Sequence, residues 1–328
     1  MSKALITGGA GFMGFHLGKY LLAKDFEIDI VDNFSRGAHD SELENLLKNN
    51  SVKLKKVDLM NTNEITNSLH SNYDYIFHLA AIVGVDNVKK QPFDVLQKNI
   101  MMLINVIQFA KKQKNLKRFL FTSTSEVYAG TLLYFGMNIP TPESTPITVN
   151  DLTKPRTSYM LSKIYGEALC NLSGLPVVII RPHNIYGPRM GMSHVIPQLL
   201  KKAHFLKETE GMEVFSPEHK RTFCYIDDAV QMIYLLVNNT SCIGQTINIG
   251  KQDYEITMYD LAGLILKIVG KENVITNMQE TDGSPARRCP DMSLFFEMIG
   301  YKAKMSLEDG IKGTYNWYRK NIFGSNCE

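Results

Sequence analysis

The chain has 328 residues, 36 Lys and Arg against 33 Asp and Glu, a formal net charge of +3 and 44% hydrophobic residues. This length suits one large α/β domain with a smaller lobe, and the near balance of charge argues against nucleic-acid or membrane-surface binding. Its five cysteines are dispersed without CxxC spacing, which favours reduced thiols and predicts no metal site. No apolar stretch approaches the ~20 residues of a membrane span, so we expect a soluble, cytoplasmic protein.

A glycine-rich turn between a strand and a helix opens the chain. Residues 4–7 are an apolar strand, and apolar side chains continue at helical spacing after Gly14. Gly8, Gly11 and Gly14 would permit a sharp turn, let the backbone approach a pyrophosphate and let the helix pack closely on the sheet. The helix N-terminus then offers unpaired N–H groups and a positive dipole end to phosphates. The turn therefore predicts a dinucleotide-binding site.

An acidic residue ends the next predicted strand, about twenty residues beyond the turn. That strand covers residues 27–32 and ends at Asp32. A carboxylate there can accept hydrogen bonds from the adenosine ribose hydroxyls and repels a 2′-phosphate. The position favours NAD over NADP, although the nearby Arg36 weakens this preference.

Strands and helices alternate through the first half of the chain. We expect further strands at 52–57, 74–79, 118–122 and 176–180, and helices at 41–48, 61–71, 94–112 and 157–172. This order predicts an α/β fold, a Rossmann-type doubly wound parallel sheet with ligands at the carboxyl ends of its strands. We place an NAD-binding domain at 1–180, with returns near 222–249, and a smaller α/β substrate lobe at 181–221 and 250–322.

Tyr159 and Lys163 lie four residues apart in a predicted helix and therefore share one of its faces. A phenol is a poor base at neutral pH because its pKa is about 10, and a nearby cation lowers that pKa. The phenolate could remove a hydroxyl proton while hydride leaves the same carbon for nicotinamide, a contribution of roughly 10²–10⁴-fold. Tyr20 and Lys24 repeat the spacing in the first helix, where we interpret them as a solvated helix face.

Hydroxyl side chains follow the predicted strand at 118–122, where substrate should lie. Among them, Thr124 could donate a hydrogen bond to the reacting oxygen and complete a catalytic triad with Tyr159 and Lys163. The other interpretation is a strand exit that merely happens to be rich in Ser and Thr.

These motifs together resemble the extended short-chain dehydrogenases/reductases of the nucleotide-sugar epimerase/dehydratase group. The resemblance runs from Lys3 to about Trp317. It rests on the glycine turn, Asp32, residues 58–59 and 78–81, the triad, and residues 181–188, 221–228 and 287–291.

The resemblance implies roles for individual residues. Those implied to bind NAD are Gly8, Gly11, Phe12, Met13, Asp32, Asn33, Asp58, Leu59, Ala80, Ala81, Tyr159 and Lys163, with Asp58 and Leu59 at the adenine. Those implied to bind the substrate are Ser125, Asn184, Val195, Arg221 and Arg288. Asn184 and the two arginines would hold the nucleotide diphosphate, the arginines through charge-assisted forks.

The step shared by this family is oxidation of the sugar 4-hydroxyl to a ketone by bound NAD. We therefore expect a net dehydrogenase or 4-epimerase in bacterial polysaccharide precursor synthesis. Ser125 and Glu126 also follow the triad threonine in UDP-glucuronate decarboxylases, so a decarboxylase or 4,6-dehydratase with Glu126 as a second acid/base group is the alternative. An orienting role for Glu126 is equally compatible with the sequence. A redox-sensing binding protein of this fold would usually lack the Tyr/Lys pair.

Two segments depart from the usual family pattern. Residues 129–154 are longer than expected, and we predict a loop over the sugar that sets specificity. Residues 189–197 resemble bacterial surface-polysaccharide members, including enzymes that oxidise a GDP-linked heptose. The predicted substrate is thus a UDP- or GDP-linked sugar. Family members commonly dimerise through the helices expected at 94–112 and 157–172, so we expect a homodimer.

Overall fold

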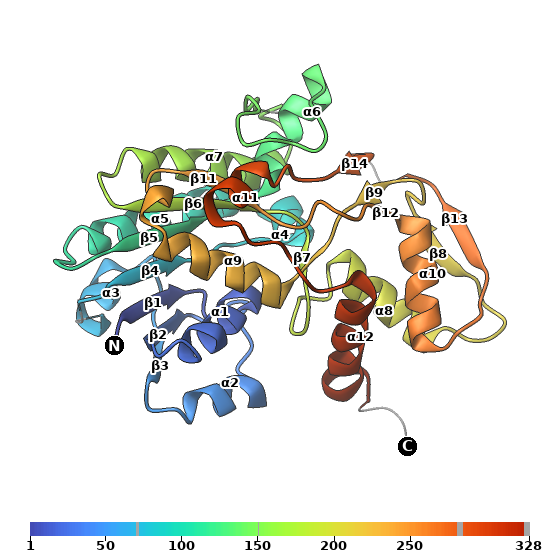
Figure 1. The fold of residues 1–328 in the computed structure, drawn as a ribbon, viewed down its shortest axis with the longest axis horizontal. Coiled ribbons are helices and arrows are strands. Elements are labelled where there is room, and N and C mark those ends of the chain that lie inside the picture. The colour runs from blue at the N-terminus through green and yellow to red at the C-terminus, as the bar shows by residue number, and fades with distance from the viewer. Residues whose placement is uncertain (70–71, 150, 281–284, 325–328) are drawn as a thin grey trace.

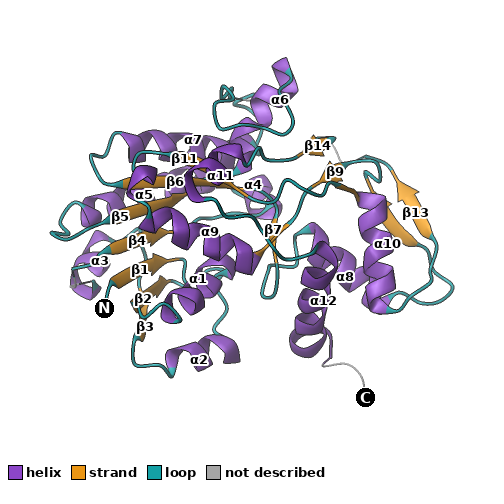
Figure 2. Ribbon diagram, in the orientation of Figure 1, coloured by secondary structure: helices purple, strands orange, loops and turns teal. Residues whose placement is uncertain are grey.

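The computed structural model describes residues 1–69, 72–149, 151–280 and 285–324. Its central layer is a seven-stranded, all-parallel sheet with the order β11-β6-β5-β4-β1-β2-β3 (Figures 1 and 2). The strands are β1 (Lys3–Thr7), β2 (Glu27–Asp32), β3 (Val52–Lys56), β4 (Tyr75–His78), β5 (Arg118–Thr122), β6 (Val177–Pro182) and β11 (Thr246–Ile249). The strand order reverses between β1 and β4, the place where such sheets bind ligands.

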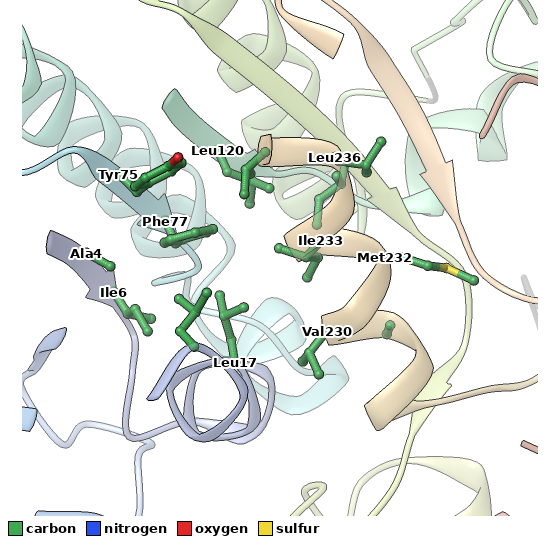
Figure 3. Packing of buried hydrophobic residues seen from close by; sticks show 14 of the residues in the cluster. Ala4, Ile6, Leu17, Tyr75, Phe77, Leu120, Val230, Met232, Ile233 and Leu236 are labelled. Atoms are coloured by element: carbon green, nitrogen blue, oxygen red, sulfur yellow. The ribbon is translucent and has the colours of Figure 1, made fainter. Parts of the chain in front are cut away.

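Helices cover both faces of this sheet because side chains of each strand point alternately to opposite faces. The flanking helices are α1 (Phe12–Leu22), α2 (Ser41–Leu47), α3 (Thr62–Ser68), α4 (Val85–Lys90), α5 (Pro92–Ala110), α7 (Thr157–Asn171), α9 (Ile226–Asn238) and α11 (Ser293–Ile299). Ile6 and Phe77 pack with Leu17 of α1 and Ile233 of α9 on one face (Figure 3). A second core with α3, α5 and α7 lies on the other face, where Leu5 is buried.

A smaller lobe follows β6 and has its own apolar core (Figure 1). Its helices are α8 (Val195–Phe205), α10 (Met258–Val269) and α12 (Leu307–Tyr318). Its short strands are β7 (Ile185–Tyr186), β8 (Met212–Phe215), β9 (Lys220–Arg221), β10 (Cys224–Tyr225), β12 (Ile256–Thr257), β13 (Ile275–Met278) and β14 (Arg287–Arg288). The sheet β12-β9-β14 brings the two predicted substrate arginines, Arg221 and Arg288, into register on neighbouring strands.

The predicted fold class is confirmed. The chain also returns to the main sheet after the lobe begins, because β11 pairs in parallel with β6. The division of the chain into two domains stays a prediction. No membrane-spanning helix occurs in the described part of the chain, since none combines the needed length with an apolar composition.

The segment predicted to be a loop over the sugar is not a simple loop. A 3-10 turn, η1 (Ser125–Tyr128), leads directly into helix α6 (Ala129–Phe135), which projects from the body of the molecule (Figure 1). Further on, Thr141 forms a parallel bridge with Pro290. Residue 150, also part of the predicted loop, lies outside the described residues. The remaining short turns are η2 (Thr240–Cys242) and the π-helical η3 (Arg319–Phe323).

Candidate active site

The glycine turn has the tight backbone that a dinucleotide site requires. Gly8 has φ of 69°, and a Cβ there would lie 2.8 Å from the backbone N and Cα of Ala80. Gly14 lies so close to the Gly8 carbonyl oxygen that a Cβ would collide with it. Gly11 is the N-cap of α1 and leaves the helix N-terminus without a side chain over it. These features fit the pyrophosphate of NAD.

The acid at the end of β2 is bound to the turn. Asp32 accepts hydrogen bonds from the backbone N–H of Ala10 at 3.1 Å and of Phe34 at 2.9 Å. Burial raises the pKa of this carboxyl, and these backbone donors oppose that effect. Asn33 beside it is exposed, and its side chain accepts from Ser35 N. The carboxylate therefore lies where the ribose of an adenosine bound at the turn would reach it.

The other residues implied to bind NAD lie at neighbouring strand ends. Asp58 follows β3 and accepts from the Met60 backbone at 2.9 Å, while Leu59 is buried. Ala80 follows β4, and its N–H donates to the Thr7 hydroxyl at 3.3 Å. Phe12, Met13 and Ala81 are half-buried residues in the first turn of α1 and beyond β4. Their binding roles stay predictions.

Thr124, Tyr159 and Lys163 converge where β5 ends against α7. Thr124 caps η1, and its hydroxyl forms a hydrogen bond with Tyr159. The ammonium of Lys163 lies 5.8 Å from the centre of the Tyr159 ring and donates to the Thr122 carbonyl at 2.7 Å. Lys163 is only 4% exposed, and burial lowers its pKa to about 8. The sequence predicted this triad, and the structure brings its members together.

The electrostatic effect on the phenol differs from our expectation. Burial raises the pKa of Tyr159, and the nearby Glu126 carboxylate raises it further. The groups that lower it are Thr124, through the hydrogen bond, and Arg36, through its charge. We expected Lys163 to be the cation that lowers this pKa. Its ammonium is instead directed to a strand carbonyl.

Tyr20 and Lys24 show the same geometry in a different setting. Lys24 lies 5.6 Å from the Tyr20 ring centre and 5.7 Å from that of Tyr234 in α9. Tyr20 is half-buried and packs on Tyr234, so this face is a contact between helices rather than fully solvated. Four-residue spacing alone therefore does not distinguish a catalytic pair.

Glu126 lies among three arginines. Its carboxylate accepts from Arg288 at 2.9 Å and from Arg156 at 3.1 Å, and Arg221 is close enough that Arg288 and Glu126 both affect its pKa. Although burial alone would raise the pKa of Glu126, Arg288 and Arg156 hold it at about 2. Glu126 is thus ionised at neutral pH and holds no proton to donate. Of the two roles that the sequence left open, this geometry supports the orienting role and disfavours a role as general acid.

The remaining residues implied to bind substrate lie on separate elements. Ser125 is buried in η1 and lines a cavity together with Arg288. Asn184 has φ of 43°, and its amide donates to the Thr222 carbonyl at 2.9 Å. Val195 is the first residue of α8 and is 36% exposed. No group of three His, Cys, Asp or Glu suited to a metal ion occurs in the ranges that the structure describes.

Sequence reasoning missed a buried ion pair behind the triad. Arg181 of β6 donates two hydrogen bonds to Glu167 of α7, at 2.9 and 2.6 Å. Glu167 also accepts from Ser123, and Arg181 also donates to the Tyr128 hydroxyl at 2.7 Å. The network ties α7, which carries Tyr159, to the end of β5, which leads to Thr124. The apolar run before Arg181 could have revealed it, because a cation that deep needs a buried partner.

Arg156 was also missed, although it lies one turn before Tyr159 at the start of α7. Such a position on the same helix face could have identified it. Its guanidinium reaches Glu126 across the end of η1.

Comparisons with known proteins agree with this geometry. The model of the NAD dependent epimerase/dehydratase family matches residues 4–250. UDP-N-acetyl-alpha-D-glucosaminuronate decarboxylase of Bacillus cytotoxicus is 32% identical over 331 residues, which cover 97% of this chain and 98% of the relative. UDP-glucuronic acid decarboxylase 1 of Xenopus tropicalis is 30% identical, covering 98% of this chain and 73% of the relative.

Solved structures of epimerases are also similar to this chain over nearly its whole length. The UDP-glucuronic acid 4-epimerase of Bacillus cereus, in complex with UDP-glucuronic acid and NAD, has a TM-score of 0.80 at 26% identity and covers 97% of this chain and 99% of its own. The UDP-glucose 4-epimerase of Thermotoga maritima, with UDP-glucose, has a TM-score of 0.82 at 26% identity and covers 98% and 99%. The chain therefore belongs to the NAD-dependent epimerase/dehydratase family of extended short-chain dehydrogenases/reductases, and its cofactor is NAD.

Proposed function

We propose that the protein is an NAD-dependent decarboxylase of a UDP-linked hexuronic acid. The observation that carries the proposal is the Glu126–Arg288 ion pair beside Thr124 and Tyr159. The chain also aligns over nearly its whole length with decarboxylases of UDP-linked uronic acids. This proposal replaces our first preference, a net dehydrogenase or 4-epimerase, although it keeps the same oxidation step.

Oxidation at C4 prepares the sugar for loss of its carboxylate. NAD, when bound, supplies the hydride acceptor and a positively charged ring next to the phenol. Tyr159 takes the proton from the 4-hydroxyl, while Thr124 holds the same oxygen. The C4 ketone is β to the C6 carboxylate, so the C5–C6 bond can break with its electron pair moving into the ketone. Carbon dioxide leaves, and a proton then adds to C5.

The charges of the site suit an anionic ligand. The charges of Arg156, Arg221 and Arg288 all act at the carboxylate of Glu126. Burial and the neighbouring Arg288 lower the pKa of Arg221 to about 10, as expected where cations gather, and it stays charged at neutral pH. Clustered guanidinium groups can bind a diphosphate and a sugar carboxylate. Since Glu126 occupies Arg288 and Arg156, the substrate carboxylate receives less stabilisation, which favours its departure.

A 4-epimerase is the second candidate. Its support is the similarity to the UDP-glucuronic acid 4-epimerase structure, an enzyme whose ligand carries the same carboxylate. Both candidates need Tyr159 and Thr124, and they differ in whether the C5–C6 bond breaks.

The test is product analysis with UDP-sugars labelled with ¹³C at C6. We expect labelled carbon dioxide from UDP-glucuronate or UDP-N-acetylglucosaminuronate in the presence of NAD. Absorbance of NADH in the same reaction shows whether reduced cofactor accumulates. A C4 epimer or 4-keto hexuronate without labelled carbon dioxide would contradict the decarboxylase. GDP- and dTDP-sugars belong in the panel, because the resemblance of residues 189–197 to GDP-heptose enzymes stays a prediction.

We also propose a homodimer formed through α5 and α7, in a protein that acts in the cytoplasm. Both helices carry exposed apolar side chains, including Phe93 at 71%, Met101 at 41% and Tyr165 at 51%. The pair Met101→Lys and Tyr165→Lys should shift sedimentation from dimer to monomer, because it places charge in an apolar contact. Val274→Lys, in the smaller lobe, is the control. A wild-type monomer at micromolar concentration would refute the interface.

A further inference from the structure

A small cavity adjoins the arginine cluster, since Arg288 is part of its wall. It has a volume of about 10 Å³, room for about one water-sized group, and is lined by Ser125, Tyr128, Leu132, Met137, His183 and Arg288, among others. Because Ser125 and Arg288 are shared with the proposed sugar site, a group on the sugar could enter this cavity. His183 is a polar residue of this lining that has no role so far.

The hydrogen bonds around His183 fix its tautomer. The Asn248 side-chain N–H₂ donates to the carbonyls of Thr141 at 3.0 Å and Asp291 at 3.3 Å, so its oxygen must face His183. That oxygen lies 3.1 Å from Nε2 of His183. Since the oxygen can only accept, Nε2 carries the hydrogen and Nδ1 is a bare acceptor.

This acceptor has no partner in the described parts of the chain. His183 is 1% exposed, and its Nδ1 is buried without a hydrogen bond. Buried polar atoms are nearly always paired, because leaving one unpaired costs about 1–3 kcal/mol. Burial, together with the charges of Arg288 and Arg181, lowers the pKa of His183 to about 3, although Asn248 opposes this. The ring is therefore neutral, and Nδ1 is an acceptor, throughout the neutral pH range.

We propose that Nδ1 of His183 accepts a hydrogen bond from a small neutral donor on the sugar, a hydroxyl group. His183 thereby selects among nucleotide sugars. A cationic donor is excluded by Arg288 and Arg181, whose charges both act on the ring. The mixed wall, with Leu132 and Met137 beside Ser125, suits a sugar substituent better than a phosphate. The inference deepens the proposed function and rests on it only in taking a UDP-sugar as ligand.

The test is a binding cycle between sugar substituents and His183. The protein is loaded with NADH, so that no oxidation consumes the ligand, and titrated calorimetrically with UDP-glucose, its 2-, 3- and 6-deoxyfluoro analogues and UDP-N-acetylglucosamine. Fluorine keeps the size of a hydroxyl but cannot donate. We expect one substituent whose loss weakens binding about tenfold in the wild type and has no effect in His183→Phe.

His204→Phe is the matched control. It makes the same exchange of imidazole for phenyl at a residue of α8 that contacts Tyr315 and Phe323 in the smaller lobe, so it should keep the wild-type selectivity. If His183→Phe does not fold, the analogue series on the wild-type protein still tests the inference. Equal binding of all analogues would show that the protein recognises no donor on the sugar. The inference is overturned if no substituent interacts with position 183, which would leave Nδ1 with a trapped water. Because binding is measured without turnover, failure of decarboxylation would leave this result unaffected.

Discussion

Tyr159 is a protonated phenol at neutral pH and in this form cannot act as a base. Burial and Glu126 raise its pKa, and only Thr124 and Arg36 lower it. A positively charged nicotinamide ring would add a cation at this position and favour the phenolate. The geometry thus suits proton removal from a substrate only when the cofactor is oxidised, because NADH carries no such charge.

Tyr159→Phe should lower the rate of C4 oxidation by roughly 10²–10⁴-fold, because it removes the general base. Tyr20→Phe is the matched control, since Tyr20 has the same lysine spacing but packs on Tyr234. Single-turnover formation of NADH measures the step directly. Equal rates for the two variants would refute the assignment of the base.

Glu126→Gln should slow decarboxylation at least about tenfold while leaving C4 oxidation within a few-fold of wild type. The amide cannot neutralise Arg288 and Arg156, which would then stabilise the substrate carboxylate before it departs. Rapid-quench analysis that separates NADH from carbon dioxide formation tests this. Glu255→Gln, which breaks the neighbouring ion pair with Arg287, is the control and should change neither step. Equal loss of both steps in Glu126→Gln would contradict the orienting role.

At the scale of elements, helix α1 contains two glycines with different roles. Gly14 packs against the backbone of Gly8 and Gly9, whereas a Cβ on Gly18 would meet only side chains at 3.7–3.8 Å. Gly14→Ala should therefore distort the turn and abolish NAD binding. Gly18→Ala should bind NAD normally and gain up to about 1 kcal/mol of stability from helix propensity. Fluorescence titration with NADH and urea unfolding measure both effects; normal binding by Gly14→Ala would show that the turn can adjust.

The elements that the sequence predicted best are those with continuous apolar strands and regular helical spacing. The strands at 27–32 and 118–122 were predicted with the bounds that the structure shows. Helix α6 was missed because residues 129–135 are followed by a segment rich in Pro and Thr, which indicated a loop. The ion pairs of Glu126 were missed because Arg156 and Arg288 lie far apart in the chain, and only the tertiary fold brings them together.

At the scale of the whole molecule, three histidines with lowered pKa values, two of them fully buried, predict lower stability in mild acid. Burial lowers the pKa of His16 to about 4 and those of His78 and His183 to about 3. Below pH 6.5 the unfolded chain binds protons at these sites that the folded chain does not, so stability falls as pH decreases. Each fully buried ring accounts for roughly 2 kcal/mol between pH 6.5 and 5.

Urea unfolding at pH 7, 6 and 5 should therefore show a falling midpoint. His183→Phe should reduce the pH dependence, because it removes one of the buried rings. A midpoint that is the same at pH 5 and pH 7 would show that these rings are protonated in the folded protein.

The buried Arg181–Glu167 pair has a consequence for how the reaction centre tolerates change. The Arg181 guanidinium contacts Glu167 of α7 and the Tyr128 hydroxyl, and Glu167 also binds Ser123. The distance between Tyr159 and Thr124 is therefore fixed by buried groups that do not contact the sugar. Losing one partner would strand a charge in the interior at a cost of about 3–5 kcal/mol. Replacing both with well-packed apolar residues would keep the fold stable. The distance between the Tyr159 and Thr124 hydroxyls would then no longer be fixed. New sugar preferences can thus evolve most easily through changes at the arginine cluster around Glu126. Changes at the buried Arg181–Glu167 pair are the least tolerated.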